Sequence, residues 1–225
     1  PLGNIAMVVE TRRRRAGATR TSVQTATALL LVFLLQAHGT QAVTDAMLKI
    51  ACSDMTPRHP GYRPENVKDT PCPYRLIVDP STPVVPGNLV NLTLTSVGTT
   101  MPFKGFMVQA RDANGRTIGT FLPECRNARK HHMITCSNGE EPYNAVVQSN
   151  NKYKLKDTFT WIAPLSLKGS FRFKFTVVLN FEHFWTNQET EDIPVAELSQ
   201  EEFELKNSFN HEYYIYNLYI KNCFV

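Results

Sequence analysis

The chain has 225 residues, 42% of them apolar, which is enough to fill the core of one good-sized domain and excludes disorder along its whole length. Its formal charge of +4 comes from residues 1–42, because the remaining residues contain as many basic as acidic side chains. Nucleic-acid binding needs a net basic face that can displace counterions from phosphates, so we expect no nucleic-acid partner.

Residues 1–42 have the order of a secretory signal. An arginine cluster at residues 12–15 precedes an uncharged apolar run at residues 29–35, and small and polar residues follow as far as Ala42. The apolar stretch is shorter than the roughly 20 residues that a membrane-spanning helix needs. We therefore expect cleavage after Ala42, secretion to the extracellular space, and no stable membrane insertion after cleavage.

Residues 43–192 are expected to form one domain built of short strands, because apolar alternation is interrupted repeatedly by proline, glycine and asparagine. No amphipathic helix is predicted before about residue 195. The expected strands are residues 74–79, a strand around Val90, and residues 105–111, 117–122, 145–148, 158–162 and 171–177. This pattern is typical of an all-β sandwich or barrel. The basic cluster at residues 126–132 is interpreted as part of a solvated polar loop.

Two of these segments carry strong local indications. Asn114-Gly115 favours a hairpin turn, because both residues tolerate a positive φ. Along residues 171–177 the phenylalanines alternate with Arg172, Lys174 and Thr176, so one face is expected to pack and the other to meet water. Residues 193–225 form a tail of uncertain structure, in which residues 197–206 are compatible with a short helix and the Tyr- and Asn-rich residues 213–219 suggest no known element.

The five cysteines lack the Cys-x-x-Cys pairs and the spacing of a zinc site, so disulfides are the better interpretation for an exported chain. Cys52, Cys72, Cys125 and Cys136 fall inside the expected domain. Cys223 is the odd thiol, either free or paired between chains.

Asn91-Leu92-Thr93 is the chain's one acceptor sequence for N-glycosylation. Apolar and polar residues alternate around it, so a strand here buries Val90, Leu92 and Leu94 and turns Asn91 toward water. On a secreted chain, we expect Asn91 to carry a glycan.

A series of short motifs follows in a fixed order between residues 51 and 187. The motifs are ACSDM at 51–55 with Pro57, HPG at 59–61, PY at 73–74, PFKGFMVQARD at 102–112, GTF at 119–121, Cys136, FTWIAP at 159–164, GSFRF at 169–173, TVV at 176–178 and FW at 184–185. In this order they resemble the reeler domain, which is found at the start of reelin and F-spondin, as small insect defence proteins, and at the head of ferric-chelate-reductase-like membrane proteins.

The resemblance implies an extracellular, immunoglobulin-like antiparallel β-sandwich with a binding role rather than a catalytic one. It also implies that Cys52 pairs with Cys136, which leaves Cys72 to pair with Cys125. Gln148 stands where the family often has histidine, so a role that depends on that imidazole is not expected.

One segment is a candidate ligand surface. Phe103, Gly105 and Phe106 could line a groove, because glycine permits close backbone approach to a ligand, and Arg111 could contact an acidic partner. The alternative is a core strand that enters through a tight bend, with Arg111 in a surface ion pair with Asp112 or Glu124.

Other side chains receive a structural interpretation. In a strand, His131 and His132 would point to opposite faces and would not easily share a metal, although a loop could allow it with His183 or His59 as a partner. Trp161 and Trp185 are interpreted as core residues rather than sugar platforms. No nucleophile or zinc-protease signature such as Gly-x-Ser-x-Gly or His-Glu-x-x-His occurs in the chain. We expect a protein that is not an enzyme and has no cofactor and no metal.

Three functions remain open. The first is a secreted defence protein that binds a microbial surface component or a host protein. The alternative is the N-terminal extracellular domain of a ferric-chelate-reductase-like membrane oxidoreductase. A matrix or guidance protein ranks third, because reelin and F-spondin carry many further modules. A sandwich hosts many unrelated sites, so the pattern names no ligand.

Overall fold

The computed structural model describes residues 45–65, 69–79, 83–98, 101–124 and 129–208. These residues belong to the compact unit that begins at Ala42. The expected secretory signal, Cys125, Cys223 and the Tyr-rich residues 213–219 lie outside the described residues.

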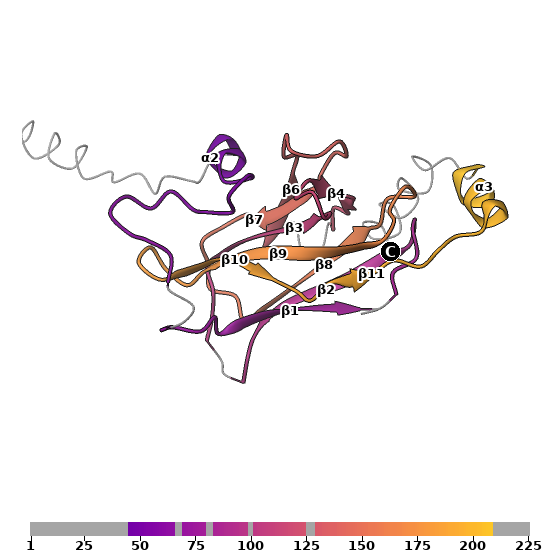
Figure 1. The fold of residues 1–225 in the computed structure, drawn as a ribbon. Helices are drawn as coiled ribbons and strands as arrows, with labels where there is room; N and C mark the ends of the chain where they lie inside the picture. Colours follow the sequence, from indigo (N-terminus) through magenta and orange to yellow (C-terminus); the bar gives the residue numbers. More distant parts are fainter. Residues whose placement is uncertain (1–44, 66–68, 80–82, 99–100, 125–128, 209–225) are drawn as a thin grey trace, which may run out of the picture. The chain divides into compact units, whose positions relative to one another are not determined.

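Two antiparallel sheets form the described fold, which confirms the expected β-sandwich (Figure 1). The smaller sheet contains, side by side, β1 (Tyr74–Asp79), β2 (Leu89–Ser96), β8 (Lys156–Ile162) and β5 (Thr120–Phe121). The larger sheet contains, in spatial order, β10 (Phe184–Glu189), β9 (Ser170–Val178), β3 (Gly105–Arg111), β7 (Ala145–Gln148) and β6 (His131–Ile134), with β4 (Thr117–Ile118) beside β3 and β11 (Ile193–Pro194) beside β9.

Side chains from both sheets meet in one apolar interior. At its centre Trp161 of β8 is fully buried and stacks on Phe171 of β9 with ring centroids 5.1 Å apart, while Phe173 meets it edge-on at 5.2 Å. The indole Nε1 of Trp161 donates to the carbonyl of Ile118 at 3.1 Å, so its one polar atom is satisfied. Trp185 is also buried, and both tryptophans are core residues as predicted.

Strand β9 shows the predicted alternation with one difference. Phe171, Phe173 and Phe175 are buried toward the interior. Thr176, on the face expected to meet water, is buried as well, because its hydroxyl donates to the carbonyl of Met55 at 2.6 Å. The outer face of the larger sheet is therefore partly covered by the chain that precedes the sandwich.

That covering segment begins with a short helix, α2 (Asp45–Ile50), and is joined to the sheet by the Cys52–Cys136 disulfide, which confirms the pairing that the resemblance implied. The bridge closes a loop of 84 residues, worth about 4.5 kcal/mol in the chain-entropy model. Leu48 and Met55 from the segment pack with Met107 and Val147 from the sheet in a second apolar cluster. Strand β3 is consequently buried on both faces.

One predicted strand is in fact two. Residues 117–122 read as a single returning strand, but β4 pairs with β3 in the larger sheet, whereas β5 pairs with β8 in the smaller one. The chain crosses between the sheets at Gly119, which has a φ of 68°. A Cβ at this position would lie 2.4 Å from the ring of Trp161 and 2.5 Å from the carbonyl oxygen of Ile162.

Replacing Gly119 by alanine is therefore expected to lower the free energy of unfolding by about 3 kcal/mol or more, through overpacking against Trp161 and a left-handed backbone. Gly115 is a matched control, because its φ is 78° but nothing lies within 4 Å of the added Cβ. Gly115→Ala should cost only the backbone strain, about 1 to 2 kcal/mol. Urea unfolding of both variants measures the difference, and equal losses would contradict the packing explanation.

Three strands, β6, β10 and β11, were not among the strands predicted from the sequence. Strand β6 occupies part of the segment interpreted as a solvated loop, and β10 extends from the Phe-Trp motif to Glu189. The sandwich also continues past the domain boundary expected at residue 192, because Ile193 of β11 pairs with Phe171 and is buried in the core. Helix α3 (Gln200–Ser208) lies within the tail, where residues 197–206 were compatible with a helix.

Candidate ligand-binding site

The ligand surface suggested by the sequence is part of the core, which corrects that hypothesis. Phe103 and Phe106 are 0% and 2% exposed, and Gly105 is buried between them. A Cβ on Gly105 would lie 3.2 Å from Cβ of Val178, so the missing side chain admits the neighbouring strand rather than a ligand. The alternative of a core strand that enters through a tight bend agrees with the structure.

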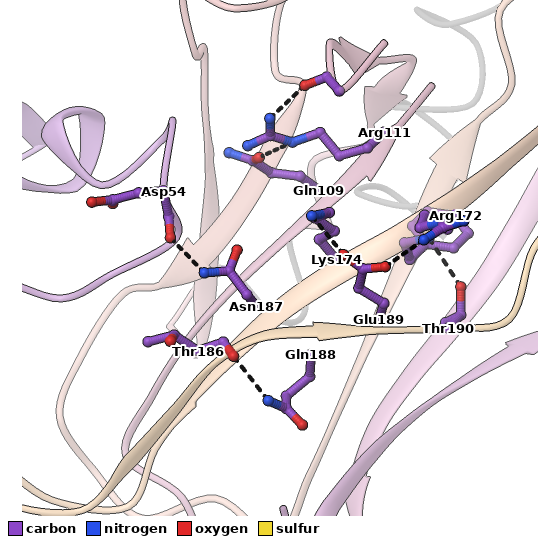
Figure 2. A network of polar contacts seen from close by, with 12 residues as sticks. Asp54, Gln109, Arg111, Arg172, Lys174, Thr186, Asn187, Gln188, Glu189 and Thr190 are labelled. Atoms are coloured by element: carbon purple, nitrogen blue, oxygen red, sulfur yellow. Dashed lines mark hydrogen bonds and ion pairs between the residues drawn. The ribbon is translucent and has the colours of Figure 1, made fainter. Parts of the chain in front are cut away.

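Arg111 is also buried, so neither a partner contact nor a surface ion pair describes it. Its guanidinium donates to the carbonyl of Cys52 at 2.7 Å and to the carbonyl of Gly115 at 2.5 Å. It also donates to the side-chain oxygen of Gln109 at 2.8 Å (Figure 2). Burial lowers the pKa of Arg111 from its usual value. Asp112, which the sequence offered as its partner, is paired with Arg116 at 3.0 Å. Arg111 therefore ties the N-terminal segment to the sheet.

The two adjacent histidines of β6 point to opposite faces, as predicted. His131 is 1% exposed and its Nδ1 lies 3.1 Å from Oδ1 of the buried Asp157 in β8, so this pair links the two sheets. Nδ1 of His132 lies 3.1 Å from the hydroxyl of Ser149 on the other side. Among the described residues, no group of three or more candidate ligands is placed to hold a metal ion.

A groove of about 750 Å³ opens along one edge of the sandwich, between β1 and the chain of β10 and β11. The volume lies within the range of small-ligand sites. Apolar side chains such as Leu76 and Phe175 contribute to its lining, and Arg75, Gln188 and Glu189 supply polar groups. It is formed where the edge strands of the two sheets face each other, because β1 and β10 each have one strand neighbour on the sheet path.

The charges along this groove compensate one another. Glu189 contacts Arg172 and Lys174 of the neighbouring strand, each at 2.6 Å (Figure 2). Asp192 contacts Arg172 at 2.8 Å. The hydrogen bond from Lys174 holds the pKa of Glu189 below its usual value, and the bond to Glu189 raises the pKa of Arg172. Glu189 is therefore placed to position polar groups of a ligand rather than to exchange protons near neutral pH.

Cys72 lies in the lining of the groove as a free thiol, with Sγ 3.5 Å from the carbonyl oxygen of Tyr74. Burial raises the pKa of this thiol. Its suggested partner, Cys125, lies outside the described residues, so that pairing stays a prediction.

Asn91 lies on the outer face of the smaller sheet. Val90, Leu92 and Leu94 are at most 1% exposed, whereas Asn91 is exposed, as the alternation predicted. The contact that its side-chain oxygen makes is with the hydroxyl of Thr160, at 3.4 Å. The acceptor amide is thus accessible, and glycosylation stays a prediction.

The groove was not predicted from the sequence, although part of its lining was visible there. Arg172 and Lys174 were placed on the polar face of their strand, but their partners come from β10 and the residues that follow it, which showed no clear alternation. Asn187, with a φ of 53°, interrupts that strand, and the pairing with β9 shifts register between Trp185 and Gln188. A bulge of this kind hides the period of two on which strand prediction depends.

Comparison with known proteins decides the family. The model of the Reeler domain matches residues 50–201, which include both sheets and the beginning of α3. The chain belongs to the reeler-domain family. The reeler domain here therefore extends beyond residue 192, in agreement with the pairing of β11.

Two relatives differ in how much of their length this reeler chain spans. It is 31% identical over 167 residues to defense protein l(2)34Fc of Drosophila melanogaster, which covers 74% of this chain and 98% of that protein. It is 30% identical over 138 residues to a protein named as a candidate ferric-chelate reductase 1 of Xenopus laevis, covering 60% of this chain and 21% of that protein. A crystal structure of the human F-spondin reeler domain aligns with a TM-score of 0.48 at 22% identity, covering 64% of this chain and 99% of that one.

Proposed function

We propose that this reeler protein is a secreted, non-enzymatic defence protein that binds an extracellular ligand, either a microbial surface component or a host protein. The observation that carries the proposal is the match to the Drosophila defence protein over 98% of that protein's length. A match that spans the whole of a small relative favours a shared role more than one that spans a fifth of a large one.

Three features that are all typical of an exported chain support secretion. The N-terminal residues have the order of a signal peptide, the Cys52–Cys136 bridge requires an oxidising compartment, and Asn91 presents an accessible acceptor for a glycan. Within the described residues, none of the helices has the length and apolar character to span a bilayer.

Binding rather than catalysis is supported by the groove beside β1. Its carboxylates Glu189 and Asp192 are held by Arg172 and Lys174, and burial raises the pKa of its Cys72 thiol. Such a groove offers fixed polar groups beside an apolar floor, which suits recognition.

The second candidate is the extracellular N-terminal domain of a ferric-chelate-reductase-like membrane oxidoreductase. The 30% identity to the Xenopus relative favours it, and the matched 138 residues correspond to about a fifth of that protein. The full transcript separates the two functions, because further apolar spans with paired histidines would establish the oxidoreductase.

The proposal is tested by expressing the chain from its own first methionine in insect cells. We expect the protein in the medium, beginning at Val43, and we expect it to sediment with bacterial or fungal cells more strongly than an unrelated secreted β-sandwich of equal charge. Its transcript should rise after microbial challenge. A product that retains Arg20, or one that neither binds cells nor is induced, contradicts the proposal.

A further inference from the structure

Three connecting segments meet at one end of the sandwich. They are residues 96–98 and 101–104 before β3, residues 129–132 at the start of β6, and residues 149–156 before and into β8. The backbone N–H of Ser149 donates to the carbonyl of Lys130 at 2.8 Å, and the ammonium of Lys154 donates to the carbonyl of Lys104 at 2.9 Å. These contacts join the three segments, which together are called the basic end below.

The basic end concentrates positive charge in a domain that is otherwise balanced. Its three segments contain six lysine or arginine residues and no aspartate or glutamate, whereas residues 43–225 as a whole contain equal numbers of both signs. Arg129, Lys130, Lys152 and Lys156 are exposed and Lys104 is half-exposed. The sequence showed the lysines and arginines only as separate small groups, and the fold brings them together.

The same end exposes large apolar side chains. Tyr153 is 62% exposed, Leu155 54%, Val97 45% and Met101 37%. The ammonium of Lys104 lies 4.6 Å from the centre of the Tyr153 ring, so the aromatic and basic groups alternate within one surface. Large apolar side chains exposed together at one end of a domain are candidates for an interaction site.

The exposure of these side chains is built into the fold. Lys154, between Tyr153 and Leu155, exchanges two backbone hydrogen bonds of 2.8 Å with Phe103. Its buried ammonium donates to the carbonyls of Lys104, Asn150 and Lys152 at 2.9 to 3.0 Å. Because Lys154 is anchored toward the domain, its two apolar neighbours are held outward.

Carboxylates on the neighbouring turn are occupied elsewhere. Glu182, in the turn between β9 and β10, accepts a hydrogen bond from Tyr62 at 3.2 Å, and Glu65 contacts His183 at 2.6 Å. Asp157, which follows the basic end directly, is buried against His131. The exposed lysines of the basic end are therefore available for an anionic partner.

We propose that the basic end binds the surface of an anionic lipid bilayer. Tyr153 and Leu155 enter the interface, while the lysines around them contact lipid phosphates. A soluble polyanion such as a sulfated glycan would use the lysines but would leave two large apolar side chains in water, so the combination favours a bilayer. The inference rests on the proposed function, in that it names a microbial membrane as the surface that the defence protein meets.

Cosedimentation of the mature chain with vesicles tests the proposal. We expect binding to vesicles of phosphatidylglycerol and phosphatidylcholine, little binding to phosphatidylcholine alone, and weakening as salt rises to 1 M. The double variant Lys130→Gln/Lys152→Gln should bind roughly 25-fold more weakly, at about fivefold per charge. Tyr153→Ser/Leu155→Ser should bind roughly tenfold more weakly.

Matched controls come from the opposite end of the domain. Lys168 and Arg116 are exposed there, and Leu205 of α3 is 58% exposed. Arg116→Gln/Lys168→Gln and Leu205→Ser should bind like the unmodified chain. Circular dichroism and urea unfolding verify that every variant is folded.

The possible outcomes distinguish a failure of the lipid proposal from a failure of the proposed function. No binding to anionic vesicles, equal losses in the control variants, or a loss in the lysine variant without one in the Tyr153 and Leu155 variant would overturn the lipid proposal. If the unmodified chain and the basic-end variants then bind microbial cells equally, the proposed function stands and only its assignment to this surface fails. If the chain binds vesicles through the basic end but binds no cells and is not induced, the defence function fails instead.

Discussion

Replacing Phe173 by aspartate is expected to abolish the recovery of folded protein from the medium of secreting cells. Phe173 is fully buried at the centre of β9, with its ring 5.2 Å from Trp161 and 5.4 Å from Phe171. Truncation of a buried phenylalanine costs about 3 to 5 kcal/mol, and an unpaired carboxylate in the same place costs several more. A domain with a total stability of about 5 to 15 kcal/mol does not survive that loss.

Ser170→Asp is the matched control, because Ser170 lies on the same strand with an exposed side chain. Its yield in the medium, measured by immunoblot of medium and cell lysate, should equal that of the unmodified chain. Phe173→Leu should give an intermediate yield. Secretion of Phe173→Asp at the normal level with an unchanged unfolding midpoint would show that the two sheets do not depend on this contact.

Most of the strands were predictable because their burial is decided locally. Strands β1, β3 and β7 have the predicted bounds, and the alternation around Asn91 gave both the buried and the exposed positions of β2. Strand β6 was missed because its first residue is histidine, whose burial depends on Asp157, 26 residues further along the chain. A polar residue that is satisfied by a distant partner gives no local indication of a strand.

The candidate site shows where local patterns become ambiguous. A glycine between two phenylalanines is compatible with a ligand groove and with close packing of strands. At Gly105 the nearby side chain of Val178 shows that the glycine serves close packing. The groove beside β1 depends on two edge strands brought together by the fold, and the basic end depends on three segments that are far apart in the sequence. Neither surface is a property of one stretch of residues, so neither was found.

Arg111 was misinterpreted for a related reason, and its buried position leads to the second prediction. Charged side chains are seldom buried unless they are paired, and the partners here are mainly backbone carbonyls, of which that of Cys52 is 59 residues away. Arg111→Met removes the hydrogen bonds to the carbonyls of Cys52 and Gly115 and leaves the buried Oε1 of Gln109 without its donor, while Nε2 of Gln109 still donates to the Cys52 carbonyl at 3.2 Å. Because a lost hydrogen bond to a charged group costs about 1.5 to 3 kcal/mol and a buried acceptor left unpaired about 1 to 3 kcal/mol, the free energy of unfolding should fall by about 3 to 5 kcal/mol.

Arg111→Lys should recover only part of this stability, because one ammonium does not reproduce the fork that reaches Cys52, Gly115 and Gln109 together. Arg116→Met is the control, since the exposed pair of Arg116 with Asp112 contributes at most about 1 kcal/mol. Urea unfolding gives the energies, and amide exchange shows where they act. Exchange should accelerate in residues 45–55 before it does in β8, because Arg111 joins that segment to the sheet. Unchanged exchange there, with normal stability, would mean that the Cys52–Cys136 bridge and the apolar contacts of Met55 are sufficient to hold the segment in place.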